Sequence, residues 1–275
     1  MDFGLDVAQH QLSWEDLLAR ARLAEDAGFD GVWLFDHFKA LYGDPAGPCL
    51  EGWTLLAALA AATERVRLGT LVTGITYRHP SILAAQAVTV DHVSGGRLEL
   101  ALGAAWHGGE HRELGIDFPP TGERIDRLEE AVEVIRLLMT TDGARYTGRH
   151  YRLEDATYRP RPVQQPHPPL WIGGSGRQRM LPFVARVADV WHTFGGPAEL
   201  ERKSRVLDEH AERAGRDPAS IRRSTSLSLS QPLDGIRRAV EERAELGFDY
   251  LVVEWPSEGQ ARLEAFVDEV APAFT

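Results

Sequence analysis

The chain has 275 residues, which is enough for one large domain or two small ones, and 43% of them are hydrophobic and 26% charged, as in ordinary globular proteins. Its formal net charge of −11 comes without a basic block, which argues against nucleic-acid or anionic-membrane binding and favours a small-molecule partner. The apolar runs are too short and interrupted to span a bilayer. One cysteine, Cys49, excludes an internal disulfide, and the amino terminus lacks a signal-like segment, so we expect a cytoplasmic protein.

Eight strand-like segments alternate with amphipathic stretches along the whole chain. The first helix is expected over 13–27, with Ser13 as its N-cap and Gly28 at its end, and further helices over 52–63, 80–93 and 122–140. The expected strands are FGLDV, GVWLF, VRLGTLV, RLELAL, PLWIGG, ADVWHT, IRRSTSLSL and YLVVEW. Eight such units in this length predict a closed parallel (β/α)₈ barrel that forms one domain over residues 1–275.

A doubly wound open sheet is the alternative fold, and one segment departs from the regular alternation. The open sheet would carry a Gly-x-Gly-x-x-Gly turn after its first strand, and FGLDVAQHQ has a single glycine there. Residues 141–168 contain no clear helix. We interpret them as an inserted hairpin followed by a proline-rich crossover into the fifth strand.

In a (β/α)₈ barrel, chemistry is carried by the loops that follow the strands, and the loop after the fourth strand reads WHGGEH. His107 to His111 match the His-x-x-Glu-His spacing of zinc proteases, which needs a helix to bring both histidines to one face. Gly108 and Gly109 disfavour such a helix, so we predict no metal site. One alternative has a helix that begins at either glycine, with Glu110 and His111 in its first turn.

The loop after the fifth strand reads GGSGR, which is one residue short of the Gly-x-Ser-x-Gly elbow of serine hydrolases. Arg177 stands at the fifth position, so Ser175 is a poor nucleophile. The run instead offers unhindered backbone N–H groups near a helix start, beside Arg177 and Arg179, as a cradle for a phosphate. The same glycines could also be simple turn residues.

Small residues at the ends of the third and fourth strands form a third feature. LGTLVTG, followed in space by Gly103, Ala104 and Ala105, could make an apolar wall against one face of a flat tricyclic ring. Barrel packing alone would equally explain these small residues.

The ordered motifs of the chain together resemble the luciferase-like monooxygenase family, and more narrowly its branch of coenzyme F420-dependent oxidoreductases. The resemblance covers about residues 1–195 and rests on GVWLFDHF, WTLLAALAAATERVRLGTLVTG, TYRHP, VDHVSGGRLELALGA, ERIDRLEEAVEVIRLL and PPLWIGG. It implies a (β/α)₈ barrel that binds the 5-deazaflavin F420, or alternatively FMN, at its carboxyl rim. Family members are often dimers, and the sequence leaves the presence of a homodimer open.

The resemblance also assigns residues to the site. Asp36 and His37 match an acidic–histidine pair near the reactive part of the deazaflavin, and Leu71 and Val72 match a pair joined by a non-prolyl cis peptide behind the central ring. Thr73 follows and is expected at the ring edge. The remaining expected cofactor contacts are Gly103, Ala104, Ala105, Gly173, Gly174, Ser175, Gly176 and Arg177, and the expected substrate contacts are Trp106, His107, Trp53 and Tyr77.

Some family members carry an acidic proton donor about where Trp106 stands, which leaves His37 as the candidate acid in this chain. We expect hydride transfer between deazaflavin C5 and a small organic substrate, for example one with an activated C=C or C=N bond. His37 or a water is expected to donate the proton, and Asp36 to orient or charge His37. The competing hypotheses are an FMN-dependent monooxygenase, a barrel that binds the cofactor without turnover, and a zinc hydrolase.

Overall fold

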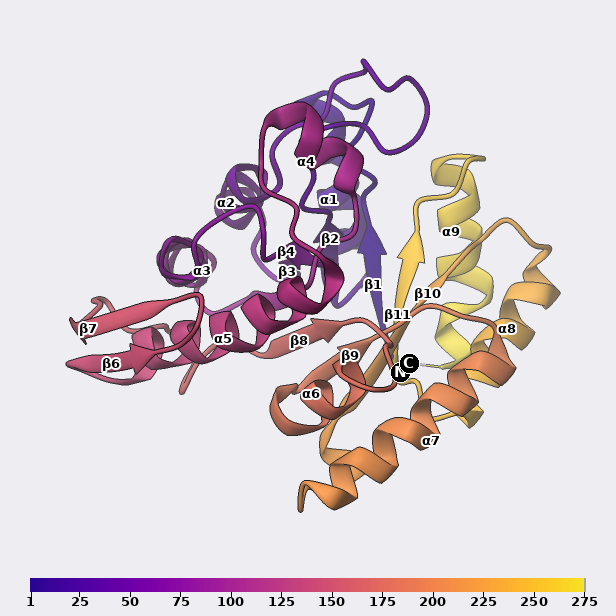
Figure 1. Cartoon of the computed structure of the whole chain (residues 1–275). Helices are drawn as coiled ribbons and strands as arrows, with labels where there is room; N and C mark the ends of the chain where they lie inside the picture. Colours follow the sequence, from indigo (N-terminus) through magenta and orange to yellow (C-terminus); the bar gives the residue numbers. More distant parts are fainter. Residues whose placement is uncertain (275) are drawn as a thin grey trace.

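The computed structural model describes residues 1–274, and in it eight parallel strands close into a barrel (Figure 1). The strands follow the order β3-β2-β1-β11-β10-β9-β8-β5, and pairing of β3 with β5 closes the ring. The predicted (β/α)₈ fold is therefore confirmed. The barrel strands are β1 (Asp2–Asp6), β2 (Gly31–Leu34), β3 (Arg67–Thr70), β5 (Leu98–Gly103), β8 (Leu170–Gly173), β9 (Val190–His192), β10 (Arg222–Leu227) and β11 (Tyr250–Glu254). A two-residue strand, β4 (Thr73–Gly74), continues beyond β3 and pairs with β5.

Helices surround the barrel (Figure 1). They are α1 (Trp14–Asp26), α2 (Gly52–Ala62), α3 (Pro80–Ser94), α4 (Gly108–Leu114), α5 (Thr121–Thr140), α6 (Met180–Val187), α7 (Pro197–Arg213), α8 (Leu233–Glu245) and α9 (Gln260–Glu269), with short 3₁₀ helices at Pro218–Ser220 and Ala271–Ala273. Helix α4 lies at the carboxyl rim of the barrel. Ser13 caps α1 through a capping box with Asp16, as its sequence pattern predicts. None of the helices within residues 1–274 combines the length and apolarity needed to cross a bilayer.

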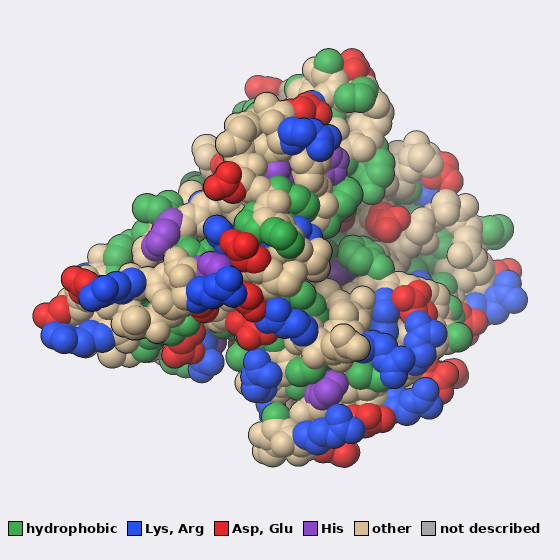
Figure 2. Space-filling model, viewed as in Figure 1, with side chains coloured by type: hydrophobic (Ala, Val, Ile, Leu, Met, Phe, Trp, Pro, Cys, Tyr) green, Lys and Arg blue, Asp and Glu red, His purple; other side chains and the backbone are tan. Residues whose placement is uncertain are grey.

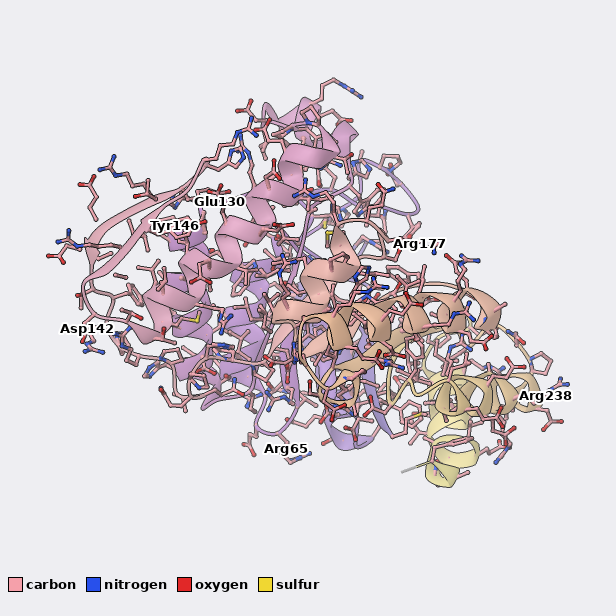
Figure 3. The ribbon with its side chains drawn as sticks, turned by 60° about the horizontal axis from the view of Figure 1, so that its bottom comes forward. Arg65, Glu130, Asp142, Tyr146, Arg177 and Arg238 are labelled. Carbon is pink, nitrogen blue, oxygen red and sulfur yellow. The ribbon has the colours of Figure 1, made fainter. Side chains whose placement is uncertain are left out.

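The predicted insertion forms an antiparallel hairpin of β6 (Ala144–Thr147) and β7 (Arg152–Ala156), which projects beside α5 in Figure 1. Glu130 of α5 accepts hydrogen bonds from the backbone N–H groups of Arg149, His150 and Tyr151, at 2.8, 2.9 and 3.1 Å. Figure 3 shows Glu130 close to Tyr146 of the hairpin. The carboxylate thus ties the turn of the hairpin to the barrel's helical layer.

An aromatic layer fills the barrel interior below the carboxyl rim. The rings of Trp33 and Trp171 lie 4.5 Å apart, and Trp171 and Tyr250 lie 5.0 Å apart. Their polar atoms are paired, because Trp33 Nε1 donates to the hydroxyl of Tyr250 at 3.1 Å and Trp171 Nε1 donates to Glu99 at 2.6 Å. This layer makes the barrel a packed core, so the cavity above it has a solid floor.

The two chain ends meet at the other end of the barrel, where the amino group of Met1 donates to the carbonyl of Phe274 at 3.0 Å (Figure 1). Figure 2 shows positive and negative side chains interspersed over the visible face, with hydrophobic side chains around a hollow near its centre.

Candidate active site

A cavity of about 460 Å³ opens at the carboxyl ends of the strands, a volume within the usual range for small-molecule sites. Thirteen of the seventeen predicted site residues line it: Asp36, His37, Leu71, Val72, Tyr77, Gly103, Ala104, Ala105, Trp106, Gly173, Gly174, Ser175 and Gly176. The lining also includes residues that sequence reasoning missed: Gly74, Thr121, Arg124, Ile125, Met180, His192, Thr193, Phe194 and Lys203.

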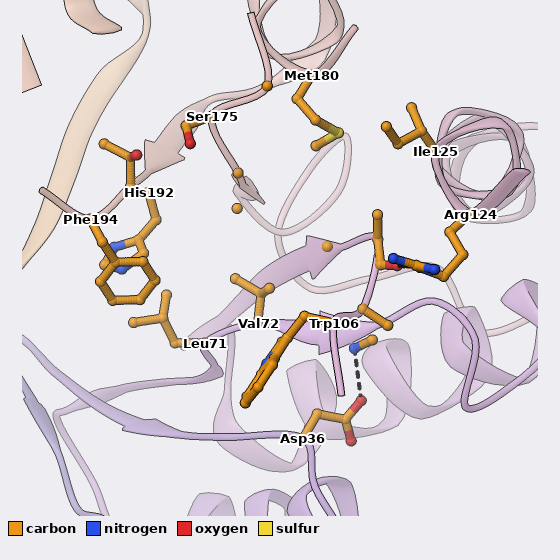
Figure 4. Close-up of a pocket in the computed structure, with 18 of the residues that line it drawn as sticks. Asp36, Leu71, Val72, Trp106, Arg124, Ile125, Ser175, Met180, His192 and Phe194 are labelled. Carbon is orange, nitrogen blue, oxygen red and sulfur yellow. Dashed lines mark hydrogen bonds between the residues drawn. The ribbon is translucent and has the colours of Figure 1, made fainter. Parts of the chain in front are cut away.

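Val72 projects from the wall at the middle of this cavity (Figure 4). The peptide bond between Leu71 and Val72 is cis, as the resemblance implies. The neighbouring strands leave room for the Val72 side chain only because they carry glycines: a Cβ on Gly103 would lie 2.6 Å from Val72 Cγ2, and one on Gly173 would lie 3.0 Å from both methyl groups. Leu71 and Val72 thus form an apolar platform, which packs against the ends of β5 and β8 at Gly103 and Gly173.

Asp36 is buried beside this platform and is held by an arginine. Its carboxylate accepts two hydrogen bonds from Arg78, at 2.6 and 2.9 Å, and one from the backbone N–H of Gly74 at 3.1 Å (Figure 4). Burial raises the pKa of Asp36, and the contact with Arg78 opposes that rise. The expectation that Asp36 orients His37 is wrong, because its carboxylate is committed to Arg78 and to the loop after the platform.

The partner of His37 is Glu110, which the sequence reasoning did not assign to the site. Glu110 Oε2 lies 2.8 Å from His37 Nδ1 and also accepts from the hydroxyl of Tyr77. Its other oxygen accepts from the backbone N–H groups of Phe38 and Lys39, at 2.7 and 3.1 Å. Burial acts to raise the pKa of Glu110, but the hydrogen bonds from His37, Tyr77 and Phe38 outweigh it and bring the pKa to about 2.

The WHGGEH segment forms the alternative helix rather than a zinc motif. Helix α4 begins at Gly108, and His107 is its N-cap, with Nδ1 accepting from the N–H of Glu110 at 2.9 Å. His111 bonds to Thr76 Oγ1 through Nε2, at 2.6 Å, and stacks on Tyr77. Among residues 1–274, no group of three or more His, Cys, Asp or Glu side chains is arranged to hold a metal ion.

Four predicted contacts lie outside the cavity lining. Trp53 is 2% exposed, and its Nε1 donates to Thr73 Oγ1 at 3.0 Å, so these two side chains bind each other behind the wall. His107 serves as the cap of α4. Arg177 is exposed and does not line the cavity.

The cationic residue at the far side of the cavity from His192 is Arg124 of α5 (Figure 4). It donates to the carbonyls of Ala104 and Pro119 and to Thr121 Oγ1, which are all neutral acceptors. Arg179, the other arginine that we expected near a phosphate, instead pairs with Asp126 at 2.6 Å and Glu129 at 3.2 Å. Arg124 therefore brings a positive charge to the cavity lining that no carboxylate of the described residues pairs with.

The fold and the site define a (β/α)₈ barrel whose carboxyl rim holds an apolar platform beside a histidine–carboxylate pair, at the end of the barrel where enzymes of this fold have their active sites. A sequence model of the luciferase-like monooxygenase family matches residues 1–234, and the chain belongs to this family. It is an oxidoreductase of the luciferase-like type.

The chain is similar to relatives that use different cofactors, as two curated proteins and one solved structure show. An F420-dependent glucose-6-phosphate dehydrogenase of Microbacterium testaceum is 35% identical over 218 residues, which cover 78% of this chain and 63% of that protein. An FMNH₂-dependent dimethylsulfone monooxygenase of Pseudomonas putida is 32% identical over 249 residues, 87% of this chain and 68% of that protein. The structure of an F420-dependent secondary alcohol dehydrogenase with an F420-acetone adduct has a TM-score of 0.90 at 21% identity, and covers 100% of this chain and 99% of its own.

Proposed function

We propose that the protein is an F420-dependent oxidoreductase that transfers a hydride between the deazaflavin and a small organic substrate. The observation that carries the proposal is the apolar platform of Val72, held between Gly103 and Gly173, with the protonatable side chain of His37 on the same cavity. The similarity to F420-dependent relatives supports the choice of cofactor. FMN is the alternative cofactor, and the similarity to an FMNH₂-dependent relative supports it.

The residues present fit a flat tricyclic group. Leu71 and Val72 supply an apolar surface, and a Cβ at either neighbouring glycine would collide with Val72 and displace it. The side chains of Ala104 and Ala105 are small, so they leave room for a ring beside the platform. The hydroxyl of Ser175 and the backbone N–H groups of the flanking glycines offer hydrogen-bond donors for the side chain of the cofactor. When bound, F420 supplies a carbon centre, C5, that gives or takes a hydride.

His37 is the residue that we propose for the proton. Its Nδ1 is bonded to the carboxylate of Glu110, so in the neutral ring the Nδ1 nitrogen carries the hydrogen and Nε2 is the basic atom. A protonated His37 can therefore release a proton from Nε2 while Glu110 fixes the ring and stabilises its charge. Addition of a hydride and this proton across an activated C=C or C=N bond balances the reduction, and the reverse sequence balances the oxidation.

Trp106 and Phe194 stand at the mouth of the cavity with 66% and 64% of their surfaces exposed. Trp106 lies with its ring centroid 5.7 Å from that of His37, next to the proposed proton donor. Exposed aromatic side chains at a cavity mouth favour planar, apolar molecules. We therefore propose a planar organic substrate that enters beside Trp106.

The test is a side-by-side titration of the purified protein with F420 and FMN, followed by quenching of cofactor fluorescence. Micromolar binding of F420 with weak FMN binding, followed by F420H₂ oxidation with an enone or imine acceptor, would support the proposal. Tighter FMN binding with oxygen consumption would move the protein to the FMN-dependent monooxygenases. Reversible F420 binding without turnover on any acceptor would indicate a binding barrel, and binding of neither cofactor would refute the proposal.

The matched variants are His37→Ala and His37→Asn. Either change should lower turnover by about 10² while leaving the dissociation constant of F420 within about threefold, since proton transfer by a positioned side chain contributes roughly this factor. Unchanged turnover in both variants would contradict the role of His37.

A further inference from the structure

A second histidine lines the cavity without a part in the proposed proton transfer. His192 is the last residue of β9, is 2% exposed, and shares its register with Gly173 on β8 and Ser224 on β10. It lies in the barrel interior on the same side of Val72 as Phe194 (Figure 4). Its position at the wall makes it a candidate for direct contact with whatever fills the cavity.

The two ring nitrogens of His192 have different surroundings. Nδ1 lies 3.0 Å from Ser224 Oγ, whereas Nε2 is buried and has no hydrogen-bond partner among residues 1–274. Burial also lowers the pKa of His192 to about 3, so the ring is neutral at physiological pH and carries one proton. The question is which nitrogen holds it.

The hydrogen bond with Ser224 determines which ring nitrogen of His192 carries the proton. Its side chain is fully buried, and within residues 1–274 His192 Nδ1 is the one hydrogen-bond partner of its hydroxyl. A buried hydroxyl proton needs an acceptor, so the Ser224 O–H donates to Nδ1. The proton of the neutral ring is then on Nε2, which becomes a donor.

His37 and His192 are therefore held in opposite tautomers. His37 gives its Nδ1 hydrogen to Glu110 and presents a basic Nε2, whereas His192 receives a hydrogen on Nδ1 and presents Nε2–H. The first histidine can exchange a proton with a ligand, and the second can only donate a hydrogen bond. One cavity thus combines a titratable group with a fixed neutral donor.

The ring of Phe194 lies beside that of His192. Its centroid lies 5.0 Å from that of His192, with the planes at 86°. An aromatic face is at most a weak acceptor, so an oxygen atom is a better partner for Nε2–H. Phe194 is 64% exposed, which leaves it free to change rotamer when a molecule enters.

We propose that Nε2–H of His192 donates a hydrogen bond to a carbonyl-type oxygen on the edge of the planar molecule that binds in this cavity. The inference rests on the proposed function for the identity of that molecule, since both the pyrimidine ring of a deazaflavin and an enone substrate carry such an oxygen. A buried N–H without an acceptor destabilises the protein. A ligand whose oxygen accepts a hydrogen bond from Nε2–H removes this penalty and therefore binds more tightly.

The test compares His192→Gln, His192→Leu and Ser224→Ala with the wild-type protein. Glutamine places an N–H donor near the position of Nε2, and leucine removes the donor. Ser224→Ala removes the hydroxyl that donates to Nδ1, so the proton of the His192 ring is no longer fixed on Nε2. Circular dichroism and thermal melting establish that each variant is folded. Fluorescence titration then gives the dissociation constant of F420, steady-state kinetics give KM for an enone acceptor, and ¹⁵N NMR of the imidazoles reports which nitrogen of His192 is protonated.

For the wild-type protein we expect the NMR signature of a neutral Nε2–H tautomer that shifts when F420 or the acceptor is added. The leucine variant should weaken binding about tenfold, the loss expected for one hydrogen bond in a buried site, whereas glutamine should stay within about threefold. A change in the dissociation constant of F420 would assign the oxygen to the cofactor, and a change confined to KM would assign it to the substrate.

Two results would overturn the inference while F420 binds normally to the wild-type protein. One is a proton on Nδ1 of His192, and the other is a folded leucine variant whose dissociation constant and KM both match the wild-type values. Failure of the wild-type protein to bind F420 or FMN would count against the proposed function instead, and the NMR measurement would still decide the tautomer.

Discussion

Glu110 Oε2 accepts a hydrogen bond from Nδ1 of His37 at 2.8 Å, although the two residues are 73 positions apart in the chain. Glu110 stands in the first turn of α4, and His37 follows β2, so the contact exists only because the loops meet at the rim of the closed barrel. The carboxylate also accepts from the backbone of Phe38 and Lys39. It therefore fixes both the ring of His37 and the path of the loop that carries it.

Replacement of Glu110 by Gln should impair proton transfer more than cofactor binding. Without the carboxylate, a charged His37 is less stabilised, so the pH of half-maximal turnover should move to lower values. Turnover at neutral pH should fall about tenfold or more, with the dissociation constant of F420 within about threefold. A pH profile of kcat is the measurement, and a profile that only drops in height would argue for a general structural loss.

The same substitution should make stability less sensitive to acid. The pKa of Glu110 is about 2 in the folded protein against an ordinary value of 4.5, so its contribution to folding is complete above pH 4.5 and is lost as pH falls toward 2. We expect Glu110→Gln to lower the free energy of unfolding by about 2 kcal/mol at pH 7, and the deficit to shrink by pH 3. Urea denaturation at both pH values measures it, and an equal deficit at both would contradict the cause.

His192 also makes the protein less stable as pH falls, but over a higher pH range than Glu110. Burial lowers its pKa from 6.5 to about 3, so below pH 6.5 the unfolded chain binds a proton that the folded protein refuses. Stability from this group is lost as pH falls from 6.5 toward 3, by about 2 kcal/mol at pH 5. His192→Gln should remove this loss, so the variant should gain relative to the wild type between pH 7 and pH 5. A constant difference between the two proteins would refute the prediction.

Trp53→Phe tests the prediction that Trp53 has a structural role and does not contact the substrate. The change removes the donor to Thr73 Oγ1 and should lower the free energy of unfolding by about 1–2 kcal/mol, while KM for the acceptor stays unchanged. Chemical denaturation and steady-state kinetics on the same preparation separate the two effects. A selective rise in KM at normal stability would restore Trp53 as a substrate contact.

Trp106→Ala tests whether the ring of Trp106, at the mouth of the cavity, contacts the substrate. Because 66% of the Trp106 surface is exposed, its loss should change the free energy of unfolding by at most about 0.5 kcal/mol. The KM for a planar acceptor should rise about tenfold, since stacking on an aromatic ring contributes roughly this much affinity. Trp106→Phe is the matched control that retains a ring, and equal KM values in all three proteins would exclude contact with the substrate.

Local chemistry in the chain explains why the barrel could be predicted. Ser13 and Gly28 mark the ends of α1, and the segments between such signals alternate in the two periods of strands and helices. Even the hairpin of β6 and β7 follows from a polar segment without helical periodicity. These patterns depend on neighbours in sequence, so they are visible before folding.

The sequence also determined which loops carry chemistry, since the residues that follow parallel strands must share one rim. Thus Asp36, Val72, Gly103 and Gly173 could be placed around one cavity from their order alone. Tertiary structure decided the partners: Glu110 for His37, Arg78 for Asp36, Thr73 for Trp53 and Ser224 for His192. Each of these hydrogen bonds depends on side-chain directions that packing fixes across different strands, and no local pattern in the chain encodes such a direction.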